Sequence, residues 1–428
     1  MHFDTSNSVS ANQTLLRTVN QRAVLNSIYL SESTSRTELA KALRISKPAT
    51  ASNLKNLLDL GIVMEVGEGN TTQSGGRKPI LLNFNKSHRY IIAIDLNYKN
   101  PIFALGNLKS EIIREFPVDV SKSITKESLE NILINAIHLL INLESISIEK
   151  IACIAVSSPG IFDPGGNLLR ANPQFKGFPW HKINYVRTLE KEFNIKAIVM
   201  NDVSAAAVGE WSMTPNDIKN LLYVSCGVGI GIRTILDHKL YEGKYYSAGE
   251  IYNNVDPEKY RKGITLEESV CMDTLILRAS GGRAKNSRGG GPLHGGDALQ
   301  AGGPLQGGDA LQGGDALTFK DIVDAYTQND PFILDAVREI GLEIGCATVN
   351  MINLLEIEKV VLGGEYIVFK DVLLDMLKQI FQKNCNYDPI TVASDLGSNQ
   401  GIYGLLFEAR EWYFSHVCTQ GDTIQNMP

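Results

Sequence analysis

Several features that would place the chain in other protein classes are missing from its 428 residues. No uninterrupted apolar run approaches the ~20 residues that a membrane span needs, and the N-terminus has no apolar signal-peptide core. The six cysteines are scattered, without a CxxC pair or a His/Cys cluster. Such a pattern indicates reduced thiols in the cytoplasm and argues against a structural zinc site. We therefore expect a cytoplasmic protein with no membrane partner, no metal and no cofactor.

The composition is that of a globular protein, but the charge is unevenly distributed. Apolar residues make up 43% and charged residues 21% of the chain, which is long enough for two or three domains. Residues 1–85 hold nine basic and six acidic residues, so this segment carries +3 while the remainder of the −6 chain carries −9. A mildly basic N-terminal segment on an acidic body is expected when only that segment meets nucleic acid.

Two short helices are predicted in the N-terminal segment. Ser35 and Glu38 have capping-box spacing, in which the serine accepts a helix-start amide and the glutamate reaches back. After a turn, Ser46 and Pro48 provide an N-cap and a first-turn proline for a second helix over 49–58. Its predicted apolar face consists of leucines, while its other faces carry small polar and basic side chains. A helix of this kind suits the DNA major groove.

Two predicted strands, 61–66 and 78–84, follow these helices and are joined by the polar loop 67–76. Helix, helix and β-hairpin in this order predict a winged helix-turn-helix; the alternative is an ordinary helical hairpin beside a β-hairpin. The expected DNA-contacting residues are Ser46, Lys47, Thr50, Ser52 and Asn53 for the bases, with Arg77 and Lys78 for phosphates.

After residue 86, apolar runs alternate with amphipathic helices, which predicts an α/β body. The expected strands are 90–96, 103–105, 151–156, 197–200, 221–225 and 359–364, and the expected helices are 129–143, 203–211 and 331–355. Ligands bind at the carboxyl ends of strands in such folds. Polar residues or glycines stand at five of these ends: Asp95, Pro159-Gly160, Asn201-Asp202, Gly227 with Gly229, and Gly363-Gly364. These ends therefore mark the expected ligand site.

A glycine-rich repeat interrupts the body. Residues 290–300 recur as 302–312, and 313–317 repeat the second half. Glycine at this density loses much backbone entropy on folding, and few leucines compensate. We expect a disordered insertion at about 281–317. The alternative, a Ca²⁺-binding repeat, would have a nine-residue period and more aspartate.

Taken together, these residues resemble the ROK family, whose repressor branch joins a winged helix-turn-helix to a sugar-kinase-like body. The resemblance covers about 15–280 and 318–412, and the matching pieces are 35–40, 46–50, 74–82, 158–163, 201–211, 227–231, 248–251 and 361–364. It implies an N-terminal winged helix-turn-helix and an α/β body of actin-like ATPase (ribonuclease H-like) fold. The implied parts are a head, 1–85; a first lobe, 86–200, joined by a C-terminal helix at about 400–416; and a second lobe, 201–400.

The resemblance also implies which residues hold sugar. Asn201 and Asp202 match the pair that binds sugar hydroxyls, and Asp202 stands at the position of the kinase general base. Glu250 and Glu267 match two sugar-binding glutamates, since carboxylates accept bonds from adjacent hydroxyls; the alternative for each is an ordinary surface acid. The remaining candidates are Gln174, for which Asn172 is the alternative, and Asn253.

Two departures from the family pattern bear on activity. Tyr98 and Lys99 stand where the kinases have small residues after Asp95, so the phosphate cradle is expected to be blocked. Asn253 replaces the family's zinc-binding histidine, and 254–263 replace its cysteine cluster. In relatives the zinc braces the sugar loop, so here the loop is either held by something else or looser.

Two main function classes remain open. The first is a sugar-responsive repressor, a homodimer that binds palindromic double-stranded operator DNA and is released by a small-molecule sugar acting as inducer. The second is a sugar kinase with an appended head, which the altered loop after Asp95 disfavours. A third is a degenerate repressor that senses nothing. By analogy with the xylose repressors of the family, xylose is the expected sugar.

Overall fold

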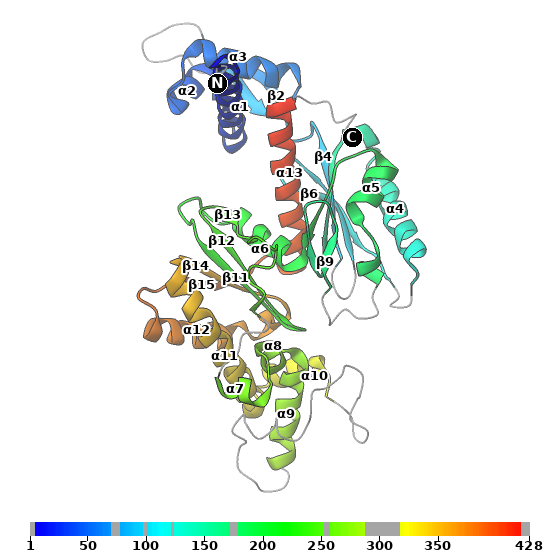
Figure 1. Cartoon of the computed structure of the whole chain (residues 1–428), viewed down its shortest axis with the longest axis vertical. Coiled ribbons are helices and arrows are strands. Elements are labelled where there is room, and N and C mark those ends of the chain that lie inside the picture. The colour runs from blue at the N-terminus through cyan, green and yellow to red at the C-terminus, as the bar shows by residue number, and fades with distance from the viewer. Residues whose placement is uncertain are drawn as a thin grey trace. The chain divides into compact units, whose positions relative to one another are not determined.

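The computed structural model describes residues 5–69, 78–96, 101–120, 124–171, 179–251, 257–286 and 317–420. They form two compact units (Figure 1). Unit 1 contains residues 1–202 and 405–428, and unit 2 contains residues 203–404. The chain therefore passes from one unit to the other after Asp202 and again after Gly404, inside the last helix. In the described ranges, no helix is long and apolar enough to cross a membrane.

Unit 1 begins with a small helical head and a three-stranded sheet of order β1-β3-β2. Its elements are α1 Thr5–Leu30, β1 Thr34–Ser35, α2 Arg36–Leu43, α3 Lys47–Asp59, β2 Val63–Glu68 and β3 Ile80–Phe84. The strands β2 and β3 pair antiparallel, as do β1 and β3. The predicted α2, α3 and hairpin strands are present, whereas α1 and β1 were not predicted.

Local capping explains where α2 and α3 begin. The Ser35 side chain accepts a hydrogen bond from the Glu38 amide at 3.3 Å, and the Glu38 carboxylate accepts one from the Ser35 amide at 2.7 Å. Ser46 caps α3 by accepting from the Ala49 amide at 3.3 Å. Between the helices, Arg44 adopts a left-handed conformation with φ of 52°. The capping box predicted from the sequence is therefore confirmed.

The rest of unit 1 is a five-stranded sheet of order β10-β7-β4-β5-β6 with helices on both faces. Its elements are β4 Tyr90–Asp95, β5 Ile102–Asn107, β6 Ile112–Pro117, α4 Lys126–Leu143, β7 Ile151–Ser158, β8 Ile161–Phe162, β9 Leu168–Arg170, α5 Tyr185–Phe193, β10 Ala197–Asn201 and the later part of α13 Gln400–Gln420. The strands β10, β7 and β4 run parallel.

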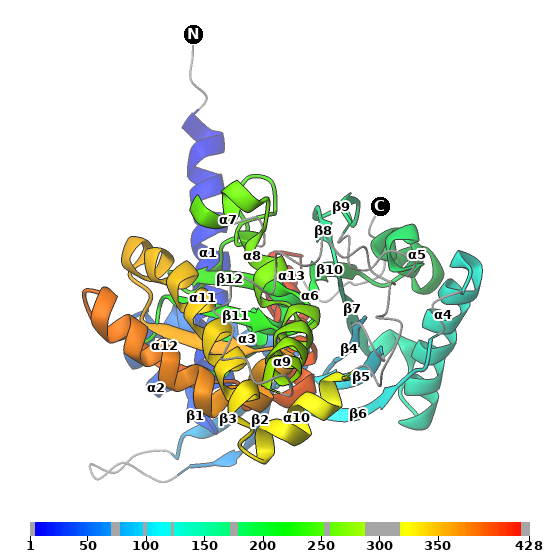
Figure 2. The same cartoon turned by 90° about the horizontal axis from the view of Figure 1, so that it is seen from below.

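Helices α4 and α5 lie on one side of this sheet and α13 on the other, in both views (Figures 1 and 2). The α4 side is a continuous apolar core in which Ile92, Phe103 and Leu133 are fully buried. On the other side, α13 approaches so closely that a Cβ added at Gly106 would lie 2.6 Å from Leu406 Cδ2. A larger residue at this position would therefore require the Leu406 side chain to shift.

Unit 2 is a second five-stranded sheet, of order β13-β12-β11-β14-β15, with a helical layer packed against it. Its elements are α6 Asp202–Ser212, β11 Leu221–Cys226, β12 Ile230–Leu236, β13 Lys239–Leu240, α7 Pro257–Lys262, α8 Leu266–Val270, α9 Met272–Asn286, α10 Phe319–Thr327, α11 Pro331–Leu355, β14 Lys359–Gly363, α12 Lys370–Asn384 and β15 Ile390–Ala393. Among the described residues, short 3-10 helices are formed by Ile148–Lys150, Pro179–Lys182, Glu365–Phe369 and Gly397–Asn399.

The predicted glycine-rich insertion needs one correction. Residues 281–286 belong to α9, and Leu317 packs against the core of unit 2, so the segment of irregular sequence is shorter than 281–317. Residues 287–316 lie outside the described residues, and their predicted disorder stays a prediction. The predicted division into a head and two lobes likewise stays a prediction.

Three aromatic rings join the head to the body of unit 1. Tyr29 of α1, Phe84 of β3 and Phe414 of α13 meet edge to face, with centroids 5.2–5.6 Å apart. Phe414 is 1% exposed. Edge-to-face pairs of this kind contribute about 0.5–1.5 kcal/mol each beyond the apolar area that they bury. We call these three residues the ring junction.

Basic side chains surround the ring junction. Arg410 lies 4.7 Å from the Tyr29 centroid and donates to the Tyr29 hydroxyl at 2.6 Å. Lys109, from the turn between β5 and β6, lies 4.3 Å from the same centroid and donates to the Tyr29 carbonyl. Arg22 of α1 pairs with Glu411 of α13. The head is therefore attached through packing, cation–π contacts and an ion pair together.

Replacing Phe414 tests the importance of the ring junction. Phe414→Ala should lower the free energy of unfolding of unit 1 by about 3–5 kcal/mol, because a buried ring is replaced by a cavity. The matched control is Ser415→Ala, an exposed neighbour on the same helix, which should change it by about 0.5 kcal/mol or less. Urea unfolding followed by circular dichroism measures both. Equal stability of the two variants would contradict the account of the junction.

Candidate functional site

Two residues predicted to contact DNA face the interior of the head. Thr50 is 1% and Asn53 is 5% exposed. The Thr50 hydroxyl donates to the Ser46 carbonyl at 3.1 Å, and the Asn53 amide donates to the Ala49 carbonyl at 2.9 Å. The prediction was wrong for these two because they precede Leu54 and Leu57 by four residues, which places them on the buried face of α3. Hydrogen bonds to carbonyls one turn earlier allow such polar side chains to be buried.

The other predicted residues of the head are at its surface where the structure describes them. Ser46, Lys47 and Ser52 are exposed, as are Ala51 and Lys55, which were not among the predicted contacts. Lys78 lies 3.9 Å from Glu68 across the hairpin, and both side chains are more than half exposed. An exposed pair of this kind contributes little to stability, so Lys78 is accessible to another partner. Arg77 lies outside the described residues.

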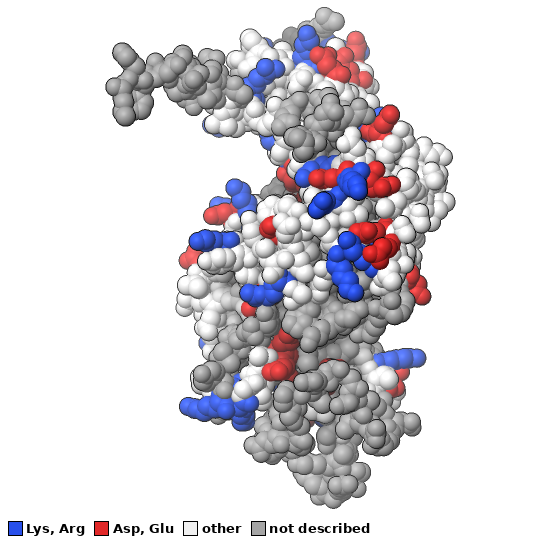
Figure 3. Space-filling model, turned by 45° about the vertical axis from the view of Figure 1, so that its right-hand side comes forward, with Lys and Arg blue, Asp and Glu red and all other residues white. Residues whose placement is uncertain are grey.

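The described charges of the body are of mixed sign on the face drawn in Figure 3. Lysine and arginine lie interspersed with aspartate and glutamate among the described residues of that view. Among the described residues of the body, Lys86 pairs with Glu111 at 2.7 Å and Arg114 pairs with Glu144 at 2.6 Å. The candidate nucleic-acid surface is the exposed face of α3, which carries Lys47, Ser52 and Lys55.

In unit 1, Asn201 and Asp202 stand where β10 ends and α6 begins. The Asn201 amide donates to the Gly160 carbonyl at 3.0 Å and to Asp202 Oδ1 at 2.9 Å. Both side chains are partly exposed. Asp202 is in the first turn of α6, where the helix dipole stabilises a carboxylate. The junction of β10 and α6 thus presents an oriented amide and carboxylate, which can bind neighbouring hydroxyl groups.

In unit 2, Glu250 forms an ion pair with Arg233 of β12, with 2.6 Å between Nη2 and Oε1. The Arg233 side chain is only 4% exposed and that of Glu250 is 22% exposed. Arg233 also donates to Ser204 at 2.8 Å and to the Ile232 carbonyl at 2.8 Å. The ion pair with Arg233 therefore fixes the position of the Glu250 carboxylate, so Glu250 is not an ordinary surface acid. Sequence reasoning missed Arg233, although an arginine within the apolar strand 230–236 is a signal for it.

Glu267, on α8, lies close enough to Glu250 for the two carboxylates to interact. Burial is the main cause that raises the pKa of Glu267 from its ordinary 4.5 to about 7; the charges of Glu250 and Glu268 act in the same direction. A hydrogen bond to the Ile230 backbone lowers the pKa in part. A perturbed carboxyl beside a second carboxyl and a buried arginine marks a candidate binding site. Gln174, its alternative Asn172, and Asn253 lie outside the described residues.

An acidic side chain lies beside the glycine-rich loop that follows β11. Glu365 follows β14, and a Cβ added at Gly227 would lie 1.9 Å from Glu365 Oε2. The carboxylate thus lies against the backbone at Gly227. A negative charge there opposes the approach of a phosphate to the backbone amide. In the sheet of unit 1, buried Asp95 accepts a hydrogen bond from Ser157, while 97–100 lie outside the described residues.

The donor set does not fit the zinc site of the resembled family. Residues 254–263 contain no cysteine or histidine. Within the ranges that the structure describes, no group of three or more His, Cys, Asp or Glu side chains is arranged to hold a metal. Residues 252–256 are not described. In this segment, Lys259 of α7 pairs with Glu343 of α11.

Comparisons with known proteins agree on one family. A model of the ROK family matches residues 91–411. A xylose repressor of Caldicellulosiruptor bescii is 27% identical over 374 residues, covering 87% of this chain and 89% of that protein. Among solved structures, a ROK family transcriptional regulator, described as a homologue of the Escherichia coli MLC protein, matches with a TM-score of 0.73 and 20% identity, covering 96% of this chain and 100% of the other. A ROK family glucokinase from Streptomyces griseus, in complex with glucose and AMPPNP, matches with a TM-score of 0.57 and 20% identity, covering 75% of this chain and 99% of the other.

Proposed function

Because the chain belongs to the ROK family, we propose that it is a sugar-responsive transcriptional repressor whose head binds operator DNA and whose body binds a sugar inducer. The observation that carries this proposal is the capped two-helix head with its antiparallel hairpin, attached to an α/β body of ROK fold. The matched transcriptional regulator covers 96% of the chain, whereas the matched glucokinase covers 75%. A head of this kind has no role in transferring phosphate.

The head is proposed to be a winged helix-turn-helix. The exposed face of α3, with Ser46, Lys47, Ser52 and Lys55, is the surface that would enter the major groove. Lys78, at the base of the hairpin, would contact phosphate together with Arg77. Palindromic operators match two-fold symmetric proteins, so we propose a homodimer. The exposed apolar side chains Leu15, Leu16 and Val19 on one face of α1 are compatible with self-association.

The proposed effector is a sugar, bound by Asn201, Asp202, Glu250 and Glu267. Each offers a carboxylate or an amide, and hydroxyl groups are the natural partners of such side chains. Xylose is the first sugar to test, because the relative that covers 87% of the chain is named a xylose repressor. Gln174 and Asn253 remain candidates on the sequence argument alone.

A sugar kinase with an appended head is the alternative, since a ROK glucokinase shares the fold of the body. Two features oppose it. Tyr98 and Lys99 replace small residues after Asp95, and the Glu365 carboxylate lies against Gly227. Phosphoryl transfer depends on positioned phosphates and charge stabilisation. Purified protein should therefore transfer no phosphate from ATP to pentoses or hexoses in a coupled assay, and robust transfer would favour the kinase.

The DNA-binding assignment is tested by two variants of the head. Lys78→Ala should weaken binding to every DNA sequence and reduce the slope of log K against log salt by about one. Ser52→Ala should instead change which sequences are preferred. Fluorescence anisotropy with operator and scrambled DNA measures both effects, and Lys378→Ala, an exposed lysine of α12, is the control. If both head variants bind DNA with the affinity, salt dependence and sequence preference of the parent protein, the assignment is refuted.

The sugar assignment is tested by Asp202→Asn, which keeps the size of the side chain but removes its charge. Sugar affinity should fall, while operator affinity without sugar stays at the parental value. The variant should therefore repress a reporter gene whether or not the inducing sugar is present. Isothermal titration with xylose and other sugars, alongside the reporter, measures the two properties. If the Asp202→Asn variant still releases the reporter gene normally when sugar is added, Asp202 is not part of the sugar site.

A further inference from the structure

A short helix carries one of the proposed sugar-binding residues. Glu267 lies on α8, which has only five residues, Leu266–Val270. Isolated helices of this length are not stable in water, so the orientation of α8 must come from its tertiary contacts. At 3.6 residues per turn, residues two apart lie on nearly opposite sides of a helix. Contacts to Ser269 are therefore among those that determine which way Glu267 points.

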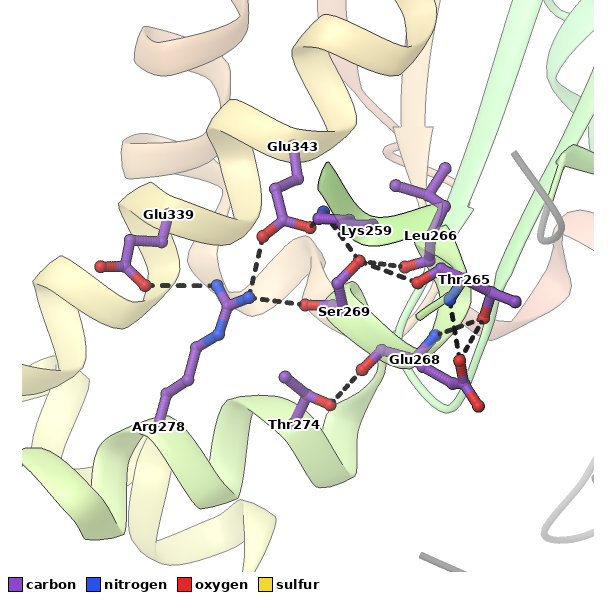
Figure 4. Close-up of polar contacts among 9 residues, drawn as sticks. All are labelled: Lys259, Thr265, Leu266, Glu268, Ser269, Thr274, Arg278, Glu339 and Glu343. Carbon is purple, nitrogen blue, oxygen red and sulfur yellow. Dashed lines mark hydrogen bonds and ion pairs between the residues drawn. The ribbon is translucent and has the colours of Figure 1, made fainter. Parts of the chain in front are cut away.

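Ser269 is fully buried and is contacted by two basic side chains (Figure 4). Lys259 of α7 donates to its hydroxyl at 3.0 Å, and Arg278 of α9 donates to its carbonyl at 3.0 Å. The hydroxyl in turn donates to the carbonyls of Thr265 and Leu266, at 3.0 and 2.9 Å. Two cations from two other helices thus fix the side of α8 that faces away from Glu267.

One carboxylate joins the two cations. Glu343 of α11 accepts from Arg278 at 2.8 Å and also pairs with Lys259 (Figure 4). The side chains of Lys259, Glu343 and Arg278 are 21%, 19% and 6% exposed. Removing one partner from such a partly buried group leaves its remaining charges without compensation, which is strongly unfavourable.

Resting on the proposed function, we propose that Glu343 positions Glu267 for the sugar effector by holding Lys259 and Arg278 against Ser269. Lys259 belongs to the segment 254–263, which contains no metal-binding cysteine or histidine. The ion-pair cluster therefore links that segment to α8, α9 and the 25-residue helix α11. Glu343 is a positioning residue, since its contacts to α8 run through the two cations.

On the opposite side of α8, this positioning controls the distance between Glu267 and Glu250. There Glu267 is hydrogen-bonded to the Ile230 backbone of β12 and lies near Glu250, which is paired with Arg233. Glu268 is turned into the cap of α8, where it accepts from the Thr265 amide at 2.8 Å. A rotation of α8 would carry Glu267 away from Glu250 and into water. The sugar site would then lose one of its two carboxylates in unit 2.

Two glutamates one turn apart on α11 provide a matched pair of variants. Glu343→Gln removes the charge that joins Lys259 to Arg278. Glu339→Gln removes a carboxylate that is 40% exposed and 3.4 Å from Arg278. In the full-length protein without sugar, hydrogen exchange of residues 264–272 should speed up in Glu343→Gln and stay at the parental rate in Glu339→Gln. Unchanged exchange in Glu343→Gln would overturn the proposal.

Sugar binding is measured on the same variants with xylose, or with the best sugar from a thermal-shift survey. Affinity should fall about 10-fold or more in Glu343→Gln, because a binding group is displaced, and less than about 2-fold in Glu339→Gln. Operator binding without sugar should be normal in both. Faster exchange of α8 with parental sugar affinity would overturn the proposed role in effector binding while leaving the repressor function intact.

The pH profile separates positioning from a general loss of stability. In the parent, Glu267 has a pKa of about 7, so its carboxylate forms as the pH rises from 6 to 8 and sugar affinity should rise with it. In Glu343→Gln, water reaches Glu267, its pKa falls, and the affinity should be low and flat over this range. Glu343→Asp should restore part of the parental profile. A parental profile in Glu343→Gln would contradict the proposal. Failure of the parent to bind any sugar would instead contradict the proposed function.

Discussion

The contact between Tyr29, Phe84 and Phe414 is the constraint on which the proposed regulation depends. These rings come from α1, β3 and α13, so they fix the head against the sheet of unit 1. The same contact is stabilised by the cation–π interactions of Arg410 and Lys109 with Tyr29 and by the ion pair of Arg22 with Glu411. Helix α13 also begins in unit 2, since the boundary between the units falls after Gly404. A ligand that changes the conformation of the body can alter operator affinity only if the head follows the body, and this junction provides that attachment.

A second constraint is electrostatic and lies in unit 2. Glu250 and Glu267 are close and partly buried, and such an arrangement is unfavourable unless other groups hold it. Buried Arg233 compensates Glu250, and the Lys259–Glu343–Arg278 cluster holds α8 from its other side. Two carboxylates kept near each other in this way are ready to accept bonds from adjacent hydroxyls. The segment 254–263 contains no cysteine that could bind a metal. Its Lys259 is instead connected to α11 by the ion pair with Glu343.

Local sequence signals predicted much of the fold and less of the site. Capping residues such as Ser35 and Ser46 determine helix starts through neighbouring atoms, so short spacings were sufficient to find α2 and α3. Helix α1 was missed because Val24, Leu25 and Ile28 are buried whereas Leu15, Leu16 and Val19 are exposed, so no single apolar stripe runs along it. Thr50 and Asn53 were misassigned because their polar groups bond to their own helix. The pairing of Lys259 with Glu343 spans 84 residues, and no local pattern encodes such a contact.

The central claim, that sugar binding and operator binding oppose each other, is tested most directly by titrating sugar into the protein with and without operator DNA. Thermodynamic linkage requires that operator weaken sugar binding by the same factor by which sugar weakens operator binding, typically about 5- to 150-fold. We expect a factor in that range, lower sugar affinity in the presence of operator, and no effect of scrambled DNA. Equal sugar affinities with and without operator would contradict it, because the two sites would then be independent.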